Sequence, residues 1–338
     1  GLRGLENFGL SCCINALLQA FSATPKLHDL LERWTVSDTE GLVSSKNVPL
    51  QLKKVLQAMR SNTSQSAVHL DFLKCLDQNK ISFCIQHDAD EVFLAILNFI
   101  ERQMTDKNLA QEIRCLFRVT LADHLQCMEC MYSVSETTCL LSLPVPLWNG
   151  DNDLEHCLKS FFEPHDLTDE DKVYCEKCGR KQPSKQGFRL ISLPPVLCLH
   201  LKRFRSSFRY AVKKLSCKVR FPQTLDFKQI VGSEQVQKQQ AQYALYAVIV
   251  HSGIAMSGHY TAYIRHGENQ LWHYADDSHV CEVTWEDVKQ TFGGFLCNKT
   301  AYMLMYKCVE EDLHFYASRP LVQALLIFRL DYYHYHLR

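Results

Sequence analysis

The pattern of hydrophobic and polar residues divides the chain into a helical front and a strand-rich back. Residues 1–112 are expected to form mainly helices. One helix face is marked by apolar residues at helical spacing: Val92, Phe93, Ile96, Phe99 and Ile100. Two further helices are predicted over 12–21 and, after Pro25, over 27–34.

From about residue 115 the pattern changes to short apolar or alternating runs that are typical of strands. These runs lie at 116–120, 140–147, 187–193, 196–204, 243–251, 260–264, 271–274 and 301–306. A helical front followed by a strand-rich back predicts an α+β fold. Residues 309–338 are set apart as a C-terminal tail to which no role is assigned.

The composition is that of a soluble globular protein, because 46% of the 338 residues are hydrophobic and 22% are charged. The formal net charge is +0 with no block of like charges, so no nucleic-acid partner is expected. The most apolar late stretch, 321–328, is interrupted by Gln323 and is far shorter than the roughly 20 residues that cross a bilayer. No membrane span is therefore expected.

Sixteen cysteines would suggest disulfides in a secreted chain. No signal peptide opens the sequence, since residues 1–7 contain no apolar run. Cys139 and Cys198 sit in apolar stretches, where buried free thiols are common. We therefore expect free thiols and a cytoplasmic protein, with the nucleus as a second location.

Four cysteines form two CxxC pairs, Cys127 with Cys130 and Cys175 with Cys178. In a reducing compartment such pairs bind metal more often than they oxidise. Each pair closes a turn that points both thiolates inward, and two such turns make a closed tetrahedral zinc site. A closed site leaves no position for water, so the Zn²⁺ would be structural. A redox pair and a chance spacing are the alternatives.

Cys12 follows a glycine-containing turn and stands at the start of a predicted helix, with Ser11 as a possible N-cap. The positive end of the helix dipole favours the thiolate, which is the nucleophilic form of cysteine. The side-chain amide of Asn7 lies close enough in sequence to donate to an oxyanion formed there. Taken alone, the stretch fits a buried Cys12–Cys13 pair at the start of an amphipathic helix better than a catalytic site.

His259 and Asp276 lie far downstream among predicted strands. A nucleophilic cysteine needs a base, and the base needs an acceptor that fixes its ring and tautomer. The chain order of Cys, then His, then Asp is that of papain-like proteases. One histidine among the 15 present would carry little weight without the other two residues.

These motifs together resemble the ubiquitin-specific proteases. The opening 4–15 is similar to their cysteine box, 258–260 with 276–277 to their histidine box, and 86–93 to their Gln-containing motif at a helix start. Further similar segments are 193–195, 200–204, 221–226 and 301–306. The resemblance covers about residues 4–307. It implies a papain-like fold with a helical thumb, a β palm and zinc-bearing β fingers that grip a modifier.

Site roles follow from the resemblance, position by position. It implies that Cys12 is the nucleophile, His259 the base, Asp276 the residue that orients His259, and Asn7 the oxyanion donor. Asp277 aligns with a second acidic residue that supports the site. Cys13 replaces the usual Tyr and Ser11 the usual Thr, while Leu10 stands where many members have a polar residue. His200, in an apolar strand, is expected to be structural.

The implied reaction is hydrolysis of the isopeptide bond between the C-terminal glycine of a ubiquitin-like modifier and a lysine. Residues 157–164 and 283–293 resemble the interferon-induced branch of the family, which removes the interferon-stimulated two-domain ubiquitin-like modifier. That branch also implies interferon-receptor signalling proteins as partners. Asp90, Glu91 and Asp276 follow the general ubiquitin-directed pattern instead, so ubiquitin itself is a second candidate substrate.

The expected organisation is one catalytic domain over 1–308, with the thumb over about 1–112, fingers and palm over 113–308, and the fingers around 115–185. Two other functions fit parts of the sequence. A catalytically inactive scaffold could hold the modifier or an interferon-receptor complex, although intact Cys12, His259 and Asp276 speak against it. A zinc-dependent hydrolase is disfavoured because the four-cysteine set lacks a neighbouring His or carboxylate ligand.

Overall fold

The computed structural model describes residues 2–35, 44–61, 65–206, 212–232, 241–255, 257–267, 269–295 and 297–309. The predicted tail lies outside these ranges except for its first residue, Val309. The late apolar stretch 321–328 also lies outside them.

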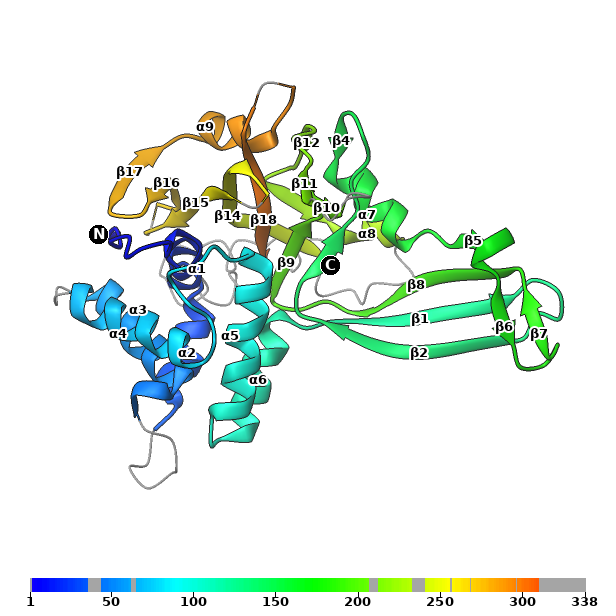
Figure 1. The fold of residues 1–338 in the computed structure, drawn as a ribbon, viewed down its shortest axis with the longest axis horizontal. Coiled ribbons are helices and arrows are strands. Elements are labelled where there is room, and N and C mark those ends of the chain that lie inside the picture. The colour runs from blue at the N-terminus through cyan, green and yellow to red at the C-terminus, as the bar shows by residue number, and fades with distance from the viewer. Residues whose placement is uncertain are drawn as a thin grey trace, which may run out of the picture.

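The front of the chain forms a group of helices, here called the thumb. Its members are α1 (Cys12–Ser22), α2 (Pro25–Arg33), α3 (Val48–Arg60), α4 (Gln65–Gln78), α5 (Ala89–Gln103) and α6 (Lys107–Phe117). Three of these helices begin where an Asn or Asp side chain accepts a backbone N–H of the first turn: Asn47, Asp88 and Asp106. Ridges of apolar residues from these helices pack together and onto one face of the central sheet (Figure 1).

The central sheet, here called the palm, has the strand order β17-β16-β15-β14-β18-β9-β3, with β13 paired to β14. The strands are β3 (Leu143–Val145), β9 (Val196–Leu201), β13 (Thr224–Asp226), β14 (Gln242–Ile254), β15 (Ser257–His266), β16 (Leu271–Asp276), β17 (His279–Val283) and β18 (Lys299–Cys308). All pairs are antiparallel except β3 with β9. Short elements border the palm: β4 (Asn152–Asp153), β10 (Phe204–Ser206), β11 (Val212–Lys214), β12 (Val219–Arg220), α8 (Phe227–Val231) and α9 (Trp285–Lys289).

Both faces of the palm are buried, because two hydrophobic cores lie against it. Ile249 of β14 belongs to the core shared with the thumb helices, whereas its neighbour Val248 belongs to the core on the other face. That second core also contains Leu158 of α7 (Leu154–Phe162). Central strands covered on both sides are expected to carry continuous apolar runs, as β14 does over 243–250 and β18 over 301–306.

A long arm projects from the palm, and we call it the fingers (Figure 1). Its sheet has the order β2-β1-β8-β5, formed by β1 (Val119–Cys127), β2 (Ser133–Leu140), β5 (His165–Leu167) and β8 (Ser184–Ser192). At its far end a separate hairpin pairs β6 (Val173–Cys175) with β7 (Arg180–Gln182).

The α+β class predicted from the sequence is confirmed, and so are the helices expected over 12–21, 27–34 and around Val92. The strand expected over 116–120 is wrong in its first half, because Leu116 and Phe117 form the last turn of α6 and the strand begins at Val119. Both residues are buried, and a short buried apolar run has no periodicity that separates helix from strand. None of the helices in the described ranges is long and apolar enough to cross a membrane.

Candidate active site and metal centre

The segment before α1 is a tight turn that places Cys12 at the start of the helix. Gly9 has a left-handed backbone (φ +73°), where a side chain would be strained and would also come within 3.0 Å of the Phe83 carbonyl oxygen. The N–H of Leu10 donates to that same carbonyl at 2.8 Å, which fixes the turn against the thumb. Cys12 is the first residue of α1 and is only 4% exposed.

Ser11 occupies the N-cap position, but it does not make the capping hydrogen bond that its position suggested. Its hydroxyl instead accepts the N–H of Phe8 at 3.0 Å and lies 3.2 Å from the Asn7 side-chain oxygen. The side chain therefore turns back into the loop, away from α1, and braces Asn7.

Cys13 lies beside Cys12 in sequence but in a different environment. Burial is the main reason why the pKa of its thiol is raised well above the ordinary value. A thiol held neutral in this way is a poor nucleophile. Of the two cysteines, the structure therefore presents Cys12 as the reactive candidate.

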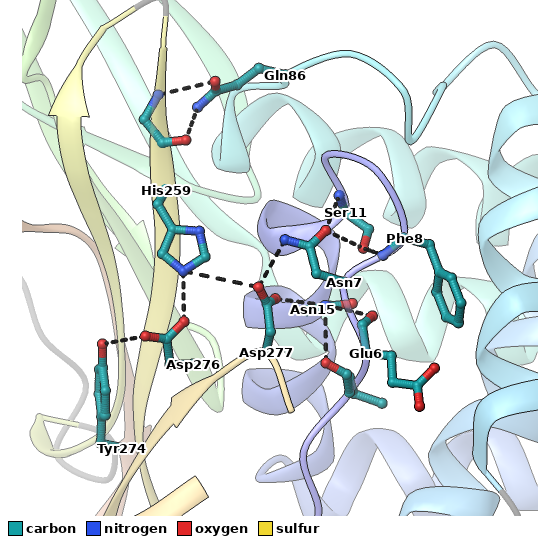
Figure 2. Close-up of polar contacts among 12 residues, drawn as sticks. Glu6, Asn7, Phe8, Ser11, Asn15, Gln86, His259, Tyr274, Asp276 and Asp277 are labelled. Atoms are coloured by element: carbon teal, nitrogen blue, oxygen red, sulfur yellow. Dashed lines mark hydrogen bonds and ion pairs between the residues drawn. The ribbon is translucent and has the colours of Figure 1, made fainter. Parts of the chain in front are cut away.

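His259 and Asp276 come together from β15 and from the end of β16 (Figure 2). His259 Nε2 lies 2.6 Å from Asp276 Oδ1, and the Tyr274 hydroxyl donates to the other oxygen of that carboxylate at 3.1 Å. The pKa of His259 is raised to about 9 despite partial burial. The largest cause is a hydrogen bond with the Cys12 side chain, and the Asp276 carboxylate contributes next. This constellation favours a thiolate–imidazolium pair between Cys12 and His259.

Asp277 lies in the two-residue turn between β16 and β17, in a left-handed conformation (φ +48°). Its carboxylate is 4.0 Å from His259 Nε2, too far for a hydrogen bond. It accepts instead from Asn7 Nδ2 at 2.9 Å and from Asn15 Nδ2 at 2.8 Å (Figure 2). Asp277 therefore supports the site by orienting two side-chain amides, and of the two carboxylates only that of Asp276 lies within hydrogen-bond distance of the imidazole.

The Asn7 carboxamide is held at both ends. Its oxygen accepts the Ser11 N–H at 3.2 Å, and one of its two amide protons is directed to Asp277. For the second N–H the described residues show no acceptor, so it is available to a bound group. Such a fixed donor can stabilise negative charge that develops on a carbonyl oxygen.

Three side chains of this site were not assigned a role from the sequence: Asn15, Tyr274 and Gln86. Asn15 and Gln86 lie within the quoted motifs, and Tyr274 lies in the strand predicted over 271–274. Gln86 holds the backbone of Gly258, with its Nε2 2.8 Å from the Gly258 oxygen and its Oε1 3.0 Å from the Gly258 nitrogen. For Asn15 and Gln86, their place inside these motifs was the signal that could have identified them. A neutral hydrogen-bonding side chain, however, does not reveal which residue it will contact.

A cavity of about 350 Å³ lies between thumb and palm and includes Gln86 in its wall, next to the His259 strand. His200 forms part of the same wall, with its Nδ1 3.0 Å from Asp90 and its Nε2 2.9 Å from the Tyr302 hydroxyl. The Tyr302 hydroxyl in turn donates to Asp88, the N-cap of α5. His200 therefore lies in a buried network that joins α5 to the palm, apart from Cys12.

The four predicted metal ligands converge at the tip of the fingers. Cys127 ends β1 and Cys175 ends β6, and each starts a turn that brings its CxxC partner alongside. The Sγ atoms lie 4.0 Å apart for Cys127 and Cys178 and 3.6 Å apart for Cys130 and Cys175. All four lie within 4.8 Å of one another.

These separations fit a tetrahedral metal site. A Zn–S bond of about 2.3 Å places two sulfurs of a tetrahedron about 3.8 Å apart. Cys127 and Cys175 are buried. Without a metal ion, four thiols packed this closely would add little to the stability of the fold. The cluster could therefore hold a metal ion.

Comparison with known sequences gives one consistent answer. A profile of the family described as "Ubiquitin carboxyl-terminal hydrolase" matches residues 3–306. "Ubl carboxyl-terminal hydrolase 18" of Homo sapiens is 35% identical over 321 residues, covering 92% of this chain and 86% of that protein. Its Mus musculus counterpart is 36% identical over 317 residues, covering 90% and 85%. "Ubiquitin carboxyl-terminal hydrolase 47" of Drosophila melanogaster is 25% identical, and only 25% of its length is covered.

A solved structure shares the fold. A chain of "the SAGA Ubp8/Sgf11/Sus1/Sgf73 DUB module bound to ubiquitin aldehyde" superposes with a TM-score of 0.76 at 24% identity, covering 91% of this chain and 69% of that one. The profile match and the relatives above 30% identity agree with the cysteine, glutamine and histidine motifs. The chain belongs to the ubiquitin carboxyl-terminal hydrolase family, whose members are the ubiquitin-specific proteases predicted from those motifs.

Proposed function

We propose that this protein is a thiol hydrolase that cleaves the isopeptide bond between the C-terminal glycine of a ubiquitin-like modifier and a substrate lysine. The observation that carries the proposal is the meeting of Cys12, His259 and Asp276, from three distant segments, with the Asn7 amide beside them. Isopeptide hydrolysis needs these residues together. Their convergence in a member of this family therefore supports the proposal that the protein is a hydrolase.

The proposed reaction has two halves. The Cys12 thiolate attacks the glycine carbonyl carbon, and the Asn7 amide stabilises the resulting oxyanion. Because His259 Nε2 faces Asp276, the other ring nitrogen, Nδ1, serves Cys12 and gives its proton to the departing lysine amine. His259 then removes a proton from water, which attacks the thioester carbonyl and releases the free modifier and the Cys12 thiolate.

The modifier we propose is the interferon-stimulated two-domain ubiquitin-like modifier. The support is the similarity over most of both chains to proteins named "Ubl carboxyl-terminal hydrolase 18". Ubiquitin is the second candidate, because Asp90, Glu91 and Asp276 follow the ubiquitin-directed sequence pattern. The solved structure with the shared fold was determined with ubiquitin aldehyde bound.

We propose that the metal of the fingers is Zn²⁺, held by Cys127, Cys130, Cys175 and Cys178. Thiolate ligands in tetrahedral arrangement favour this ion. With four protein ligands the ion would have no open coordination position, so it would cross-link two turns and take no part in hydrolysis.

The cysteines also bear on location. None of the sixteen forms a disulfide in the structure, and some, such as Cys84, are exposed. Such a chain suits a reducing compartment, so we propose the cytoplasm, with the nucleus as the alternative. Interferon-receptor signalling proteins remain proposed partners, on the basis of the resemblance to the interferon-induced branch.

The test offers ubiquitin and the two-domain modifier side by side, each carrying an electrophile at its C-terminus. Wild-type protein should form a covalent adduct with the two-domain modifier, Cys13→Ala should still do so, and Cys12→Ala should not. Equal labelling by both modifiers would make the protein a general deubiquitinase. Labelling that survives Cys12→Ala but is lost in Cys13→Ala would contradict the proposed nucleophile, and no labelling of wild-type protein would favour a scaffold.

A further inference from the structure

The Gln86 side chain is joined to the main chain of the residue that precedes His259. Its amide donates to the Gly258 carbonyl oxygen at 2.8 Å and accepts the Gly258 N–H at 3.0 Å (Figure 2). Gln86 belongs to the thumb, just before α5, whereas Gly258 and His259 belong to β15 of the palm.

These two hydrogen bonds take the place of the backbone pairing that a neighbouring strand would give Gly258. β14 pairs with β15 along one edge, with Ser252 opposite His259. On the other edge β16 pairs with β15 only from Ala262 onward. The Gly258 N–H and C=O would therefore have no strand partner on that side, and unpaired backbone groups near the protein interior are costly. The Gln86 amide supplies the donor and the acceptor that a neighbouring strand would supply.

Gly258 is also confined on the face of β15 from which a side chain would project. A Cβ atom at this position would lie 2.2 Å from His251 Nε2 and 2.4 Å from the Ser252 carbonyl oxygen, so only glycine fits. His251 is buried and packs against the Phe204 and Tyr260 rings. The backbone that leads into His259 is thus held between His251 and Gln86.

We propose that Gln86 is a positioning residue for His259. It does not touch the reacting atoms; it fixes Gly258 and thereby the direction from which the imidazole reaches Cys12. The importance of this role for catalysis rests on the function proposed above. The imidazole must align with the thiol within a few tenths of an ångström, so its position depends on the backbone that carries it.

Docking of the thumb does not depend on Gln86 alone. Asp88 accepts the Tyr302 hydroxyl, and the Asp90 carboxylate lies 3.0 Å from His200 Nδ1. These contacts join the start of α5 to β18 and β9. Removal of the Gln86 amide should therefore leave thumb and palm together and free mainly the Gly258–His259 segment.

The test uses the full chain with the variants Gln86→Ala and the nearly isosteric Gln86→Glu, which keeps an acceptor but loses the donor. We would measure alkylation of Cys12 by iodoacetamide at pH 7, read by peptide mass spectrometry, because this reagent needs no modifier binding. Both variants should be alkylated about tenfold more slowly than wild type, since the imidazolium no longer stabilises the thiolate. With a fluorogenic C-terminal derivative of the modifier, kcat should fall by about the same factor while KM stays within about twofold.

Gln103→Ala is the matched control. Gln103 also makes two hydrogen bonds, to the Val48 N–H and to Asn79, but entirely within the thumb. This variant should lower the thermal midpoint without slowing Cys12 alkylation. Wild-type alkylation rates in folded Gln86 variants, or a change confined to KM, would overturn the proposal.

Wild-type protein gives an independent readout that needs no variant. The Gly258 amide proton should be protected from hydrogen exchange, although among the described residues no strand pairs with Gly258 on the side of β15 that faces Gln86. Exchange at the rate of an unprotected amide would overturn the inference even if both Gln86 variants failed to fold. If wild type cleaved neither modifier while the alkylation difference persisted, the proposed function would fail and the positioning role would stand.

Discussion

The charge state of one histidine sets the pH range in which Cys12 can react. Contact with Cys12 and with Asp276 raises the pKa of His259 to about 9 from an ordinary value near 6.5. The imidazolium is therefore present at neutral pH, and its favourable interaction is complete below about 6.5 and lost as pH rises through about 9. We predict that kcat/KM holds across the neutral range and falls above pH 9.

Asp276→Asn should move that basic limb to lower pH and reduce kcat/KM by about 10²-fold or more, because the acceptor that charges and orients His259 is weakened. A pH–rate profile with the fluorogenic modifier measures both effects. Asp123→Asn alters a carboxylate bonded to Gln186 in the fingers and should leave the limb in place. An unshifted limb in Asp276→Asn would show that Asp276 does not govern the histidine.

A second prediction concerns Asp277, whose oxygens hold Asn7 and Asn15 rather than His259. Asn7→Ala should lower kcat by about 10²–10³-fold with little change in KM, as expected for loss of an oxyanion donor. If Asp277 acts by orienting Asn7, Asp277→Ala should add little in the Asn7→Ala background. A double-mutant cycle on kcat measures this coupling, and fully additive losses would assign Asp277 another role.

At the scale of elements, we expect the fingertip to depend on the proposed Zn²⁺ more than on its own packing. The β6–β7 hairpin is an isolated two-stranded sheet, and Tyr174 within it is 61% exposed. Such a hairpin is marginal without a cross-link. Cys175→Ser, or removal of the metal by a chelator, should therefore increase hydrogen exchange over 173–182 and abolish the bound zinc measured by elemental analysis.

The same change should leave the chemistry of Cys12 intact, because the cysteine cluster lies at the far end of the fingers (Figure 1). Alkylation of Cys12 should proceed at the wild-type rate, while the affinity for the modifier falls. Cys139→Ser removes an exposed thiol of β2 that lies outside the cluster and serves as the control. Loss of Cys12 reactivity on chelation would mean that the metal contributes to more than the fingertip.

The sequence was informative where an element has a strong signal of its own. The α5 helix has an Asp N-cap and a regular apolar face, and the spacing of the CxxC pairs predicts a metal site. The strand β2, Ser133–Leu140, was missed because it is an outer strand with mostly exposed polar residues, so neither face carries an apolar alternation. The contact between Gln86 and Gly258 was also out of reach, since a neutral amide does not reveal which distant backbone it will meet.

At the scale of the whole molecule, β14 connects the two cores, and its register could not be read from the sequence. Residues 245–250 are buried throughout, so no polar position marks which face each side chain takes. A shift in pairing with β18 between Leu245 and Ala247 further breaks the alternation. As a result Leu245 and Ile249, which strict alternation would place on one face, belong to different cores.

This shared strand predicts that thumb and palm unfold together. Leu245→Ala and Ile249→Ala each remove a fully buried side chain and should lower the free energy of unfolding by about 2–5 kcal/mol. Although one variant opens a cavity on the thumb side and the other on the opposite side, both should shift one cooperative transition. Hydrogen exchange should then lose protection equally in α1 and in β9. If Ile249→Ala released the thumb helices while the strands facing the second core kept their protection, thumb and palm would be separate folding units, and the geometry between Cys12 and His259 would depend on their docking alone.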